Sequence, residues 1–118
     1  MKLDMKKAEE LANKLRYRNV ERTIVAVVQD VESREVLMTA YMTREAFIKT
    51  LTTGLMHYWS LSRKKIWMKG ETSGNIQEVA DAYIDCDGDA VLFLVKQHGV
   101  ACHEGFRSCF HRKIRSED

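Results

Sequence analysis

All three cysteines of this 118-residue sequence lie near other residue types that bind metals. Cys86 is flanked by two aspartates, Cys102 precedes His103, and Cys109 follows in the same segment. Three thiolates can hold zinc and leave one tetrahedral position free, as a catalytic zinc site requires. The residues therefore favour a zinc site over three unrelated buried thiols. His103 or His111 could instead supply a fourth ligand and close the site.

Three aspartates alternate through the segment that contains Cys86. If the segment is extended, alternate side chains share one face, so Asp85, Asp87 and Asp89 would lie together and Cys86 would face the other way. Carboxylates this close repel one another unless a hard cation such as Mg²⁺ neutralises them. The segment is not an EF-hand, because Lys96 stands at the twelfth loop position, where a glutamate is required. A solvated acidic turn is the alternative to a magnesium site.

A loop rich in glycine and hydroxyl side chains occupies residues 70–75, and basic residues precede it. Exposed backbone N–H groups and nearby cations can bind a phosphate. The loop is not a P-loop, because it lacks the Gly-Lys-Ser/Thr order, and a generic turn is the alternative. The candidate phosphate-binding residues are Arg63, Lys69, Gly70, Glu71, Thr72, Ser73 and Gly74.

Two histidines are candidate proton acceptors. His103, beside Cys102, is the first choice and His57 is the second. Trp59 and Trp67 could stack on a nucleotide base, although large aromatic residues in alternating strands usually belong to the core.

Length and composition predict a single domain over residues 1–118, with 45% hydrophobic residues available for a core. The net charge of +2 gives no case for nucleic-acid binding. No apolar run is long enough to cross a bilayer, and the N-terminal segment is too charged for a signal peptide. We therefore expect a cytoplasmic protein with reduced cysteines, acting without a membrane or a nucleic acid.

The hydrophobic pattern predicts an α+β, β-rich chain with a dominant antiparallel or mixed sheet. Helices are expected over residues 5–18 and from an N-cap at Thr43 to a stop at Gly54. A polar turn over residues 30–35 should join the first two strands into a hairpin. The expected strands cover residues 22–29, 36–42, 55–61, 65–69, 76–84 and 90–97.

Taken together, these motifs resemble the phosphoribosyl-AMP cyclohydrolase family. The resemblance extends over roughly residues 20–112 and includes the stretch at residues 27–47. The family often has proline where this chain has Val25 and glycine where it has Arg34. The motifs that carry the resemblance most specifically are WSxSR at residues 59–63, WxKGETSGNxQ at 67–77, DCDxD at 85–89 and CHxGxxSCF at 102–110.

The resemblance implies a pseudobarrel of mostly antiparallel or mixed strands with peripheral helices. It also implies a hydrolase of histidine biosynthesis, which opens the adenine ring of the nucleotide phosphoribosyl-AMP between N1 and C6 to give the formimino-carboxamide ribonucleotide. It further implies a homodimer in which Cys86 of one subunit joins Cys102 and Cys109 of the other around an interface zinc. The aspartates that match the family's magnesium ligands are Asp85, Asp87 and Asp89.

Three thiolates make a zinc centre negative, which should weaken its effect on the pKa of bound water, so a separate proton acceptor such as His103 gains importance. Two alternatives come from other classes: a binding module with a structural zinc, and a thiol redox protein. The second is weaker, because the chain has no Cys-x-x-Cys motif.

Overall fold

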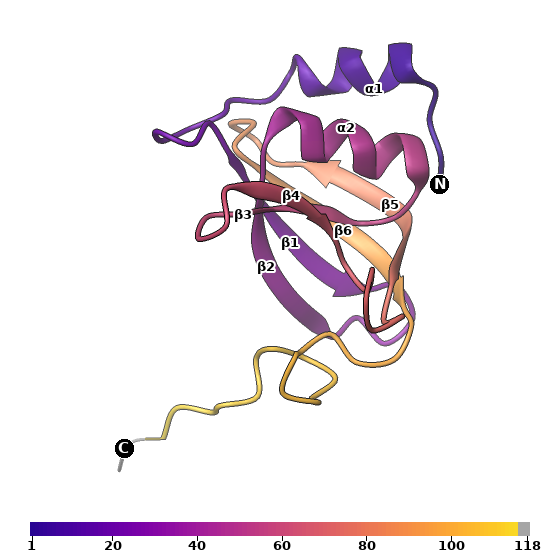
Figure 1. Ribbon diagram of the computed structural model, residues 1–118, viewed down its shortest axis with the longest axis vertical. Coiled ribbons are helices and arrows are strands. Elements are labelled where there is room, and N and C mark those ends of the chain that lie inside the picture. Colours follow the sequence, from indigo (N-terminus) through magenta and orange to yellow (C-terminus); the bar gives the residue numbers. More distant parts are fainter. Residues whose placement is uncertain (116–118) are drawn as a thin grey trace.

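Six strands form one mixed sheet, and two helices lie together along one side of it (Figure 1). The computed structural model describes residues 1–115. The strands follow the order β4-β3-β2-β1-β6-β5, in which β1 and β6 run parallel and the other neighbours run antiparallel. The curled, half-barrel sheet confirms the predicted α+β, β-rich fold. The elements are α1 (Met5–Ala12), β1 (Ile24–Asp30), β2 (Val36–Met42), α2 (Arg44–Thr53), β3 (His57–Ser60), β4 (Lys65–Met68), β5 (Gln77–Ile84) and β6 (Ala90–Gln97).

The core lies between the sheet and α2. Ile24, Ala26 and Val28 of β1 are fully or almost fully buried, as alternation along a strand requires. Phe47 of α2 packs against Phe93 of β6, with 6.3 Å between the ring centroids. Burial of each such large apolar side chain contributes roughly 1.5–3 kcal/mol. Along the part of the chain that the structure describes, no helix has the length and apolar character needed to span a membrane.

The second helix begins and ends where the sequence predicts. The Thr43 hydroxyl accepts a hydrogen bond from the Ala46 N–H at 3.2 Å, which satisfies one of the free donors of the first turn. Gly54 ends the helix with a φ of 77°, in the left-handed region that glycine adopts without steric cost.

The first helix is shorter than the predicted span of residues 5–18, because it ends at Ala12. The Tyr17 hydroxyl donates to the Ala12 carbonyl at 2.9 Å, and the Arg16 N–H donates to the Gly88 carbonyl at 2.7 Å. Residues 13–18 therefore pack back against the helix and the β5–β6 turn instead of continuing the helix. Neither the hydrogen bond to the distant Gly88 nor the side-chain hydrogen bond of Tyr17 is visible in a local hydrophobic pattern.

The predicted β1–β2 hairpin is present, and its loop contains a strained residue. Arg34 has a φ of 66°, in the left-handed region that costs a residue with a side chain roughly 1–2 kcal/mol. The family resemblance implies glycine at this position, so the loop keeps the left-handed geometry without the residue best suited to it.

We expect Arg34→Gly to stabilise the protein by about 0.5–1 kcal/mol, because the relief of strain exceeds the greater freedom of glycine in the unfolded chain. The hydrogen bond from Gln29 Nε2 to the carbonyl of residue 34, 2.8 Å long, does not need the side chain and should persist. Urea unfolding measures the change. Glu32→Gly, in the same loop but without a positive φ, is the matched control and should destabilise. A lower unfolding midpoint for Arg34→Gly would contradict the assignment of strain.

Candidate active site and metal ligands

A pocket of about 410 Å³ opens beside the loop that follows β4. Six of the seven candidate phosphate-binding residues line this pocket, and Gly74 does not. Phosphate binding itself stays a prediction. The lining residues are Ser60, Arg63, Lys65, Trp67, Met68, Lys69, Gly70, Glu71, Thr72 and Ser73.

The pocket loop depends on the absence of a side chain at residue 70. Gly70 has a φ of 81°, and a Cβ there would lie 2.5 Å from backbone atoms of Asn75 and Ile76. The Gly74 N–H donates to the Gly70 carbonyl at 2.8 Å, which closes the loop on itself. Within residues 1–115, the N–H groups of Thr72 and Ser73 find no acceptor. Two unpaired donors beside basic residues suit an anion.

Lys69 connects this pocket to the two C-terminal cysteines. Its Nζ donates to the Ala101 carbonyl at 2.5 Å and lies 5.8 Å from the centroid of the Trp67 ring. Partial burial lowers the pKa of Lys69, while the nearby thiols of Cys109 and Cys102 act in the opposite direction. The cation therefore lies between the pocket and the thiols, where it can attract both a phosphate and a thiolate.

Cys102 and Cys109 lie close together. Cys102 is buried, and its Sγ accepts a hydrogen bond from the Glu104 N–H at 3.4 Å. Burial raises the pKa of Cys109, and the adjacent Cys102 raises it further through charge and hydrogen bonding. Two thiols in this arrangement disfavour two simultaneous negative charges unless a cation neutralises them. A bound metal cation meets this requirement, so the pair fits a metal site.

Two further donors lie beside Cys102. Its Sγ is 3.9 Å from Nε2 of His111 and 4.0 Å from Oε1 of Glu104. His111 and Glu104 are themselves 3.5 Å apart. The His111 ring stacks on Phe106, with 3.8 Å between the centroids and 13° between the planes.

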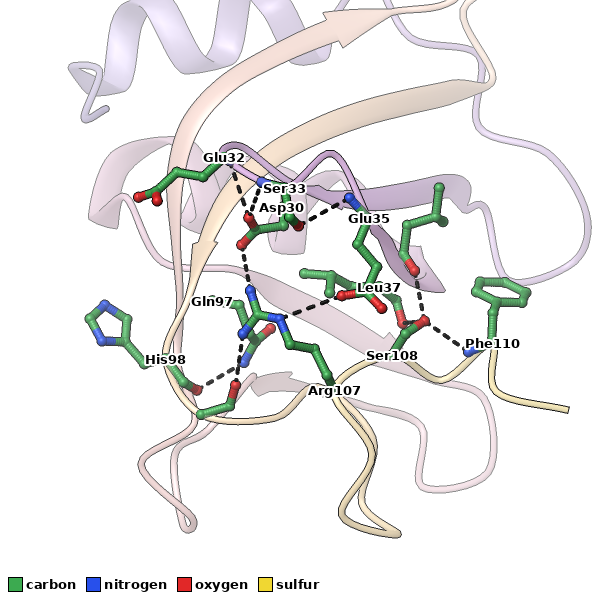
Figure 2. A network of polar contacts seen from close by, with 12 residues as sticks. Asp30, Glu32, Ser33, Glu35, Leu37, Gln97, His98, Arg107, Ser108 and Phe110 are labelled. Atoms are coloured by element: carbon green, nitrogen blue, oxygen red, sulfur yellow. Dashed lines mark hydrogen bonds and ion pairs between the residues drawn. The ribbon is translucent and has the colours of Figure 1, made fainter.

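The chain containing these donors is tied to the β1–β2 loop by a polar network (Figure 2). Arg107 donates to Asp30 at 2.9 Å and lies 3.5 Å from Glu35. The Ser108 hydroxyl donates to the Val36 carbonyl at 2.7 Å. The backbone N–H of Ser33 is the main cause of a lowered pKa at Asp30, against the opposing effect of burial. This network fixes the base of the cysteine-bearing segment.

We expect Asp30→Ala to destabilise the protein by about 1–2 kcal/mol at pH 7, because the charged hydrogen bonds to Asp30 are lost. The effect is no larger because water screens the charge of the half-exposed Arg107. Because the pKa of Asp30 is lowered on folding, its contribution is present above the ordinary carboxylate pKa and disappears as the pH falls through the folded value. Urea unfolding at pH 7 and near pH 3 should show the difference shrinking at acid pH. Glu32→Ala, in the same loop, should show little effect at either pH. A pH-independent difference would exclude the ionised carboxylate as its source.

The three aspartates gather at the β5–β6 turn. Oxygen atoms of Asp85, Asp87 and Asp89 all lie within 4.8 Å of one another. The segment is a turn and not extended, so the predicted reason for this grouping was wrong. The turn itself collects the carboxylates, because Asp85 Oδ1 accepts the N–H groups of Asp89 and Ala90 at 3.1 and 3.2 Å.

The charge of this cluster is partly balanced by a residue from outside the recognised motifs. Arg18 Nε lies 2.9 Å from Asp89, and Nη2 of the same guanidinium lies 4.0 Å from Asp87. The pKa of Asp87 is raised by its carboxylate neighbours, with hydrogen bonding to Asp89 as the largest cause. The pKa of Asp89 is lowered, chiefly by its hydrogen bond with Asp87 and then by Arg18. The three carboxylates outnumber the Arg18 guanidinium, so the cluster keeps unbalanced negative charge, and a hard cation fits there.

Comparison with known proteins shows the family of this chain. Residues 38–111 match the model of the family described as phosphoribosyl-AMP cyclohydrolase, a span that includes every candidate site residue. The chain belongs to the phosphoribosyl-AMP cyclohydrolase family. A phosphoribosyl-AMP cyclohydrolase of Sulfurisphaera tokodaii is 59% identical over 97% of both chains. The phosphoribosyl-AMP cyclohydrolase of Ignicoccus hospitalis is 53% identical over 97% of this chain and 89% of its own length. That of Methanocaldococcus jannaschii is 60% identical over 85% of this chain and 80% of its own length.

In this member of the cyclohydrolase family, Cys86 lies far from the other two cysteines. Cys86 lies in the β5–β6 turn, just before β6 begins at Ala90, the partner of Val25 in β1. The segment with Cys102 follows the other end of β6 and lies near Asp30, at the far end of β1. The strand between these ends is roughly 23 Å long. Figure 1 shows the turn near α1 and the C-terminal segment at the opposite end of the sheet. One chain therefore cannot place all three thiols on a single metal ion.

The two candidate proton acceptors differ in their surroundings. His57 is half-buried on β3, and its Nδ1 donates to the Leu55 carbonyl at 2.8 Å, which leaves Nε2 as the acceptor. His103 is exposed in the turn after Cys102. Both catalytic roles stay predictions.

Sequence reasoning missed Glu104, Asp30 and Arg107. Asp30 and Arg107 are far apart in the chain, and no local pattern connects them. Glu104 could have been found, because it lies within the cysteine motif and carries a metal-binding oxygen.

Proposed function

We propose that this chain hydrolyses phosphoribosyl-AMP by opening its adenine ring between N1 and C6, giving the formimino-carboxamide ribonucleotide of histidine biosynthesis. The observation that supports this most directly is the link from a basic, hydroxyl-lined pocket through Lys69 to a pair of cysteine thiols. A nucleotide needs an anion site for its phosphate, and ring hydrolysis needs a polarising centre nearby. Family membership supports the same reaction. Such a biosynthetic enzyme with reduced thiols would belong in the cytoplasm.

The pocket suits the phosphate end of the substrate. Arg63 and Lys69 supply positive charge, and the N–H groups of Thr72 and Ser73 supply donors. Trp67 lines the same pocket and offers a flat surface to the base or the ribose.

We propose that Cys102 and Cys109 hold zinc together with Cys86 of the partner subunit. The thiol pair suits a zinc ion, because two adjacent thiols can both lose their protons only when a cation neutralises the charge. Bound zinc supplies a Lewis acid, which makes water a nucleophile near neutral pH. His103 then accepts the proton from the attacking water and can return it to N1, which stays tethered in the product. His57 is the second candidate for this role.

We propose a homodimer, which the position of Cys86 and the open face of the sheet both support. On that face, opposite the buried alternates, Val25, Tyr41 and Tyr83 are 38%, 39% and 55% exposed. Val25 pairs with Tyr41, and Tyr41 pairs with Trp59, so they adjoin. The Trp59 indole N–H is buried without an acceptor among the residues described. A second copy would cover this apolar surface and bring its Cys86 to the thiol pair.

We propose that magnesium binds Asp85, Asp87 and Asp89 and orients a phosphate or ribose oxygen of the substrate. In the proposed dimer these carboxylates come from the subunit that donates Cys86. Each site would therefore take its pocket from one chain and its magnesium from the other.

We expect Asp87→Asn to lower turnover and the response to added magnesium while about one zinc per chain stays bound, since carboxylates prefer hard cations and thiolates prefer zinc. Titration of activity with Mg²⁺ and zinc analysis check this. Asp81→Asn, an exposed aspartate on β5 of the same hairpin, is the matched control and should leave both unchanged. Zinc loss with unchanged magnesium dependence would reverse the assignment of the two metals.

The proposed function is tested by the absorbance change on incubation of the purified protein with phosphoribosyl-AMP, together with its metal content. Zinc and turnover that both disappear on chelation and return with zinc support the cyclohydrolase. Zinc without turnover would instead identify a binding module with a structural metal. Turnover that is unaffected by complete zinc removal would overturn the metal assignment.

A further inference from the structure

We propose that Cys102, Glu104 and His111 form a zinc site that is complete enough within one chain to hold the metal before the partner subunit supplies Cys86. This inference rests on the proposed function only for the later use of the metal. The site differs from the three-thiolate set in its donors, since it combines sulfur, oxygen and nitrogen from one short segment.

The spacing of the three donors supports this assignment. The separations are 3.9 Å for sulfur to nitrogen, 4.0 Å for sulfur to oxygen and 3.5 Å for nitrogen to oxygen. Bond lengths to tetrahedral zinc place such ligand atoms about 3.3–3.7 Å apart. The observed triangle is therefore within a few tenths of an ångström of a ligand face, and small side-chain rotations suffice to close it.

The surrounding structure holds two of these donors in place. The Phe106 ring stacks on His111 and orients the imidazole. The Phe106 carbonyl also accepts the Cys102 N–H at 3.0 Å, which fixes the turn that carries both residues. The N–H of Glu104 donates to Cys102 Sγ, a contact that stabilises a thiolate. An ion pair between His111 and Glu104 alone would not explain why the buried sulfur of Cys102 lies close to both side chains.

Cys109 lies against Cys102 but outside the compact three-donor group. Assembly would therefore exchange donors: Glu104 and His111 leave as Cys109 and the partner's cysteine bind. The number of protein ligands stays at three, so the fourth tetrahedral position is left for water both before and after the exchange. A subunit that loads zinc first would carry the metal into the dimer interface.

The test uses the full-length chain with Cys86→Ser, which removes the interface thiol without touching this segment. We expect about one Zn²⁺ per chain, bound more weakly than in the wild type, in competition with a chromophoric chelator. Adding His111→Phe keeps the ring stack on Phe106 and removes the nitrogen ligand. Zinc affinity should then fall by more than about 100-fold, because even residues that only support a ligand contribute 10–100-fold.

His98→Phe in the same Cys86→Ser background is the matched control. His98 also pairs with a glutamate, Glu78, but lies away from the cysteines, so zinc affinity should stay unchanged. Zinc X-ray absorption of Cys86→Ser should show imidazole nitrogen that His111→Phe removes. Circular dichroism and the unfolding midpoint verify that each variant folds.

Equal zinc affinity with and without His111→Phe would overturn the inference, as would a folded Cys86→Ser protein that binds no zinc. Failure of the proposed function has a different signature. If the wild-type protein shows no turnover but zinc binding in the Cys86→Ser background still depends on His111, this site stands. If the wild type is active and zinc binding in the Cys86→Ser background does not depend on His111, this site alone is removed.

Discussion

An equal mixture of Cys86→Ser and Cys102→Ser proteins, unfolded and refolded together, should recover about one quarter of the wild-type turnover, although each variant alone is inactive. Random pairing makes half of the dimers mixed, and a two-fold symmetric mixed dimer has one intact site and one doubly damaged site. The reason is the length of β6, which separates Cys86 from the other two cysteines. The change in turnover is large, because activity reappears from two proteins that are each inactive.

A mixture of Cys102→Ser and Cys109→Ser is the matched control. Both of these cysteines belong to the same side of the proposed site, so no mixed dimer contains an intact set and activity should stay absent. Differently tagged chains establish that mixed dimers form. If they form and the first mixture stays inactive, the three thiolates do not meet across a subunit interface.

The fold was predictable where local chemistry decides it. Thr43 and Gly54 bound α2 because a hydroxyl cap and a left-handed residue act on their immediate neighbours. The β1–β2 hairpin followed from two apolar runs and a polar turn. The end of α1 was mispredicted, because it depends on a hydrogen bond from Arg16 to the distant Gly88 and on a side-chain hydrogen bond from Tyr17 back to the last residue of the helix.

The candidate site was predictable in composition but not in arrangement. Carboxylates, thiols and the glycine-rich loop are visible as residue types, and the structure brings the loop and Cys102 together through Lys69. The grouping of the aspartates was expected from an extended strand and arises from a turn. The support from Asp30 and Arg107, and the balance of charge by Arg18, join residues too distant in sequence for spacing to reveal.

The proposed mechanism needs a protein group that accepts a proton. A zinc centre with three thiolates is already negative, so it should acidify water less than a centre with neutral ligands. The attacking water then needs a positioned base. His103 is exposed beside Cys102, where it is free to meet the substrate, whereas His57 is held by the Leu55 carbonyl.

We expect His103→Ala to keep zinc and the dimer but to lose about 10²–10⁴-fold in turnover, the usual contribution of a positioned acid–base group. His98→Ala, which removes an exposed histidine elsewhere, is the control and should retain near-normal turnover. The wild-type rate should fall at low pH, and both the base and water activated by zinc would contribute to that fall. The comparison of the two variants therefore decides between them. If His103→Ala keeps a near-normal rate and the same fall in rate at low pH, His103 is only a neighbour of a metal ligand. Nε2 of His57 then becomes the base to test, by the same substitution to alanine.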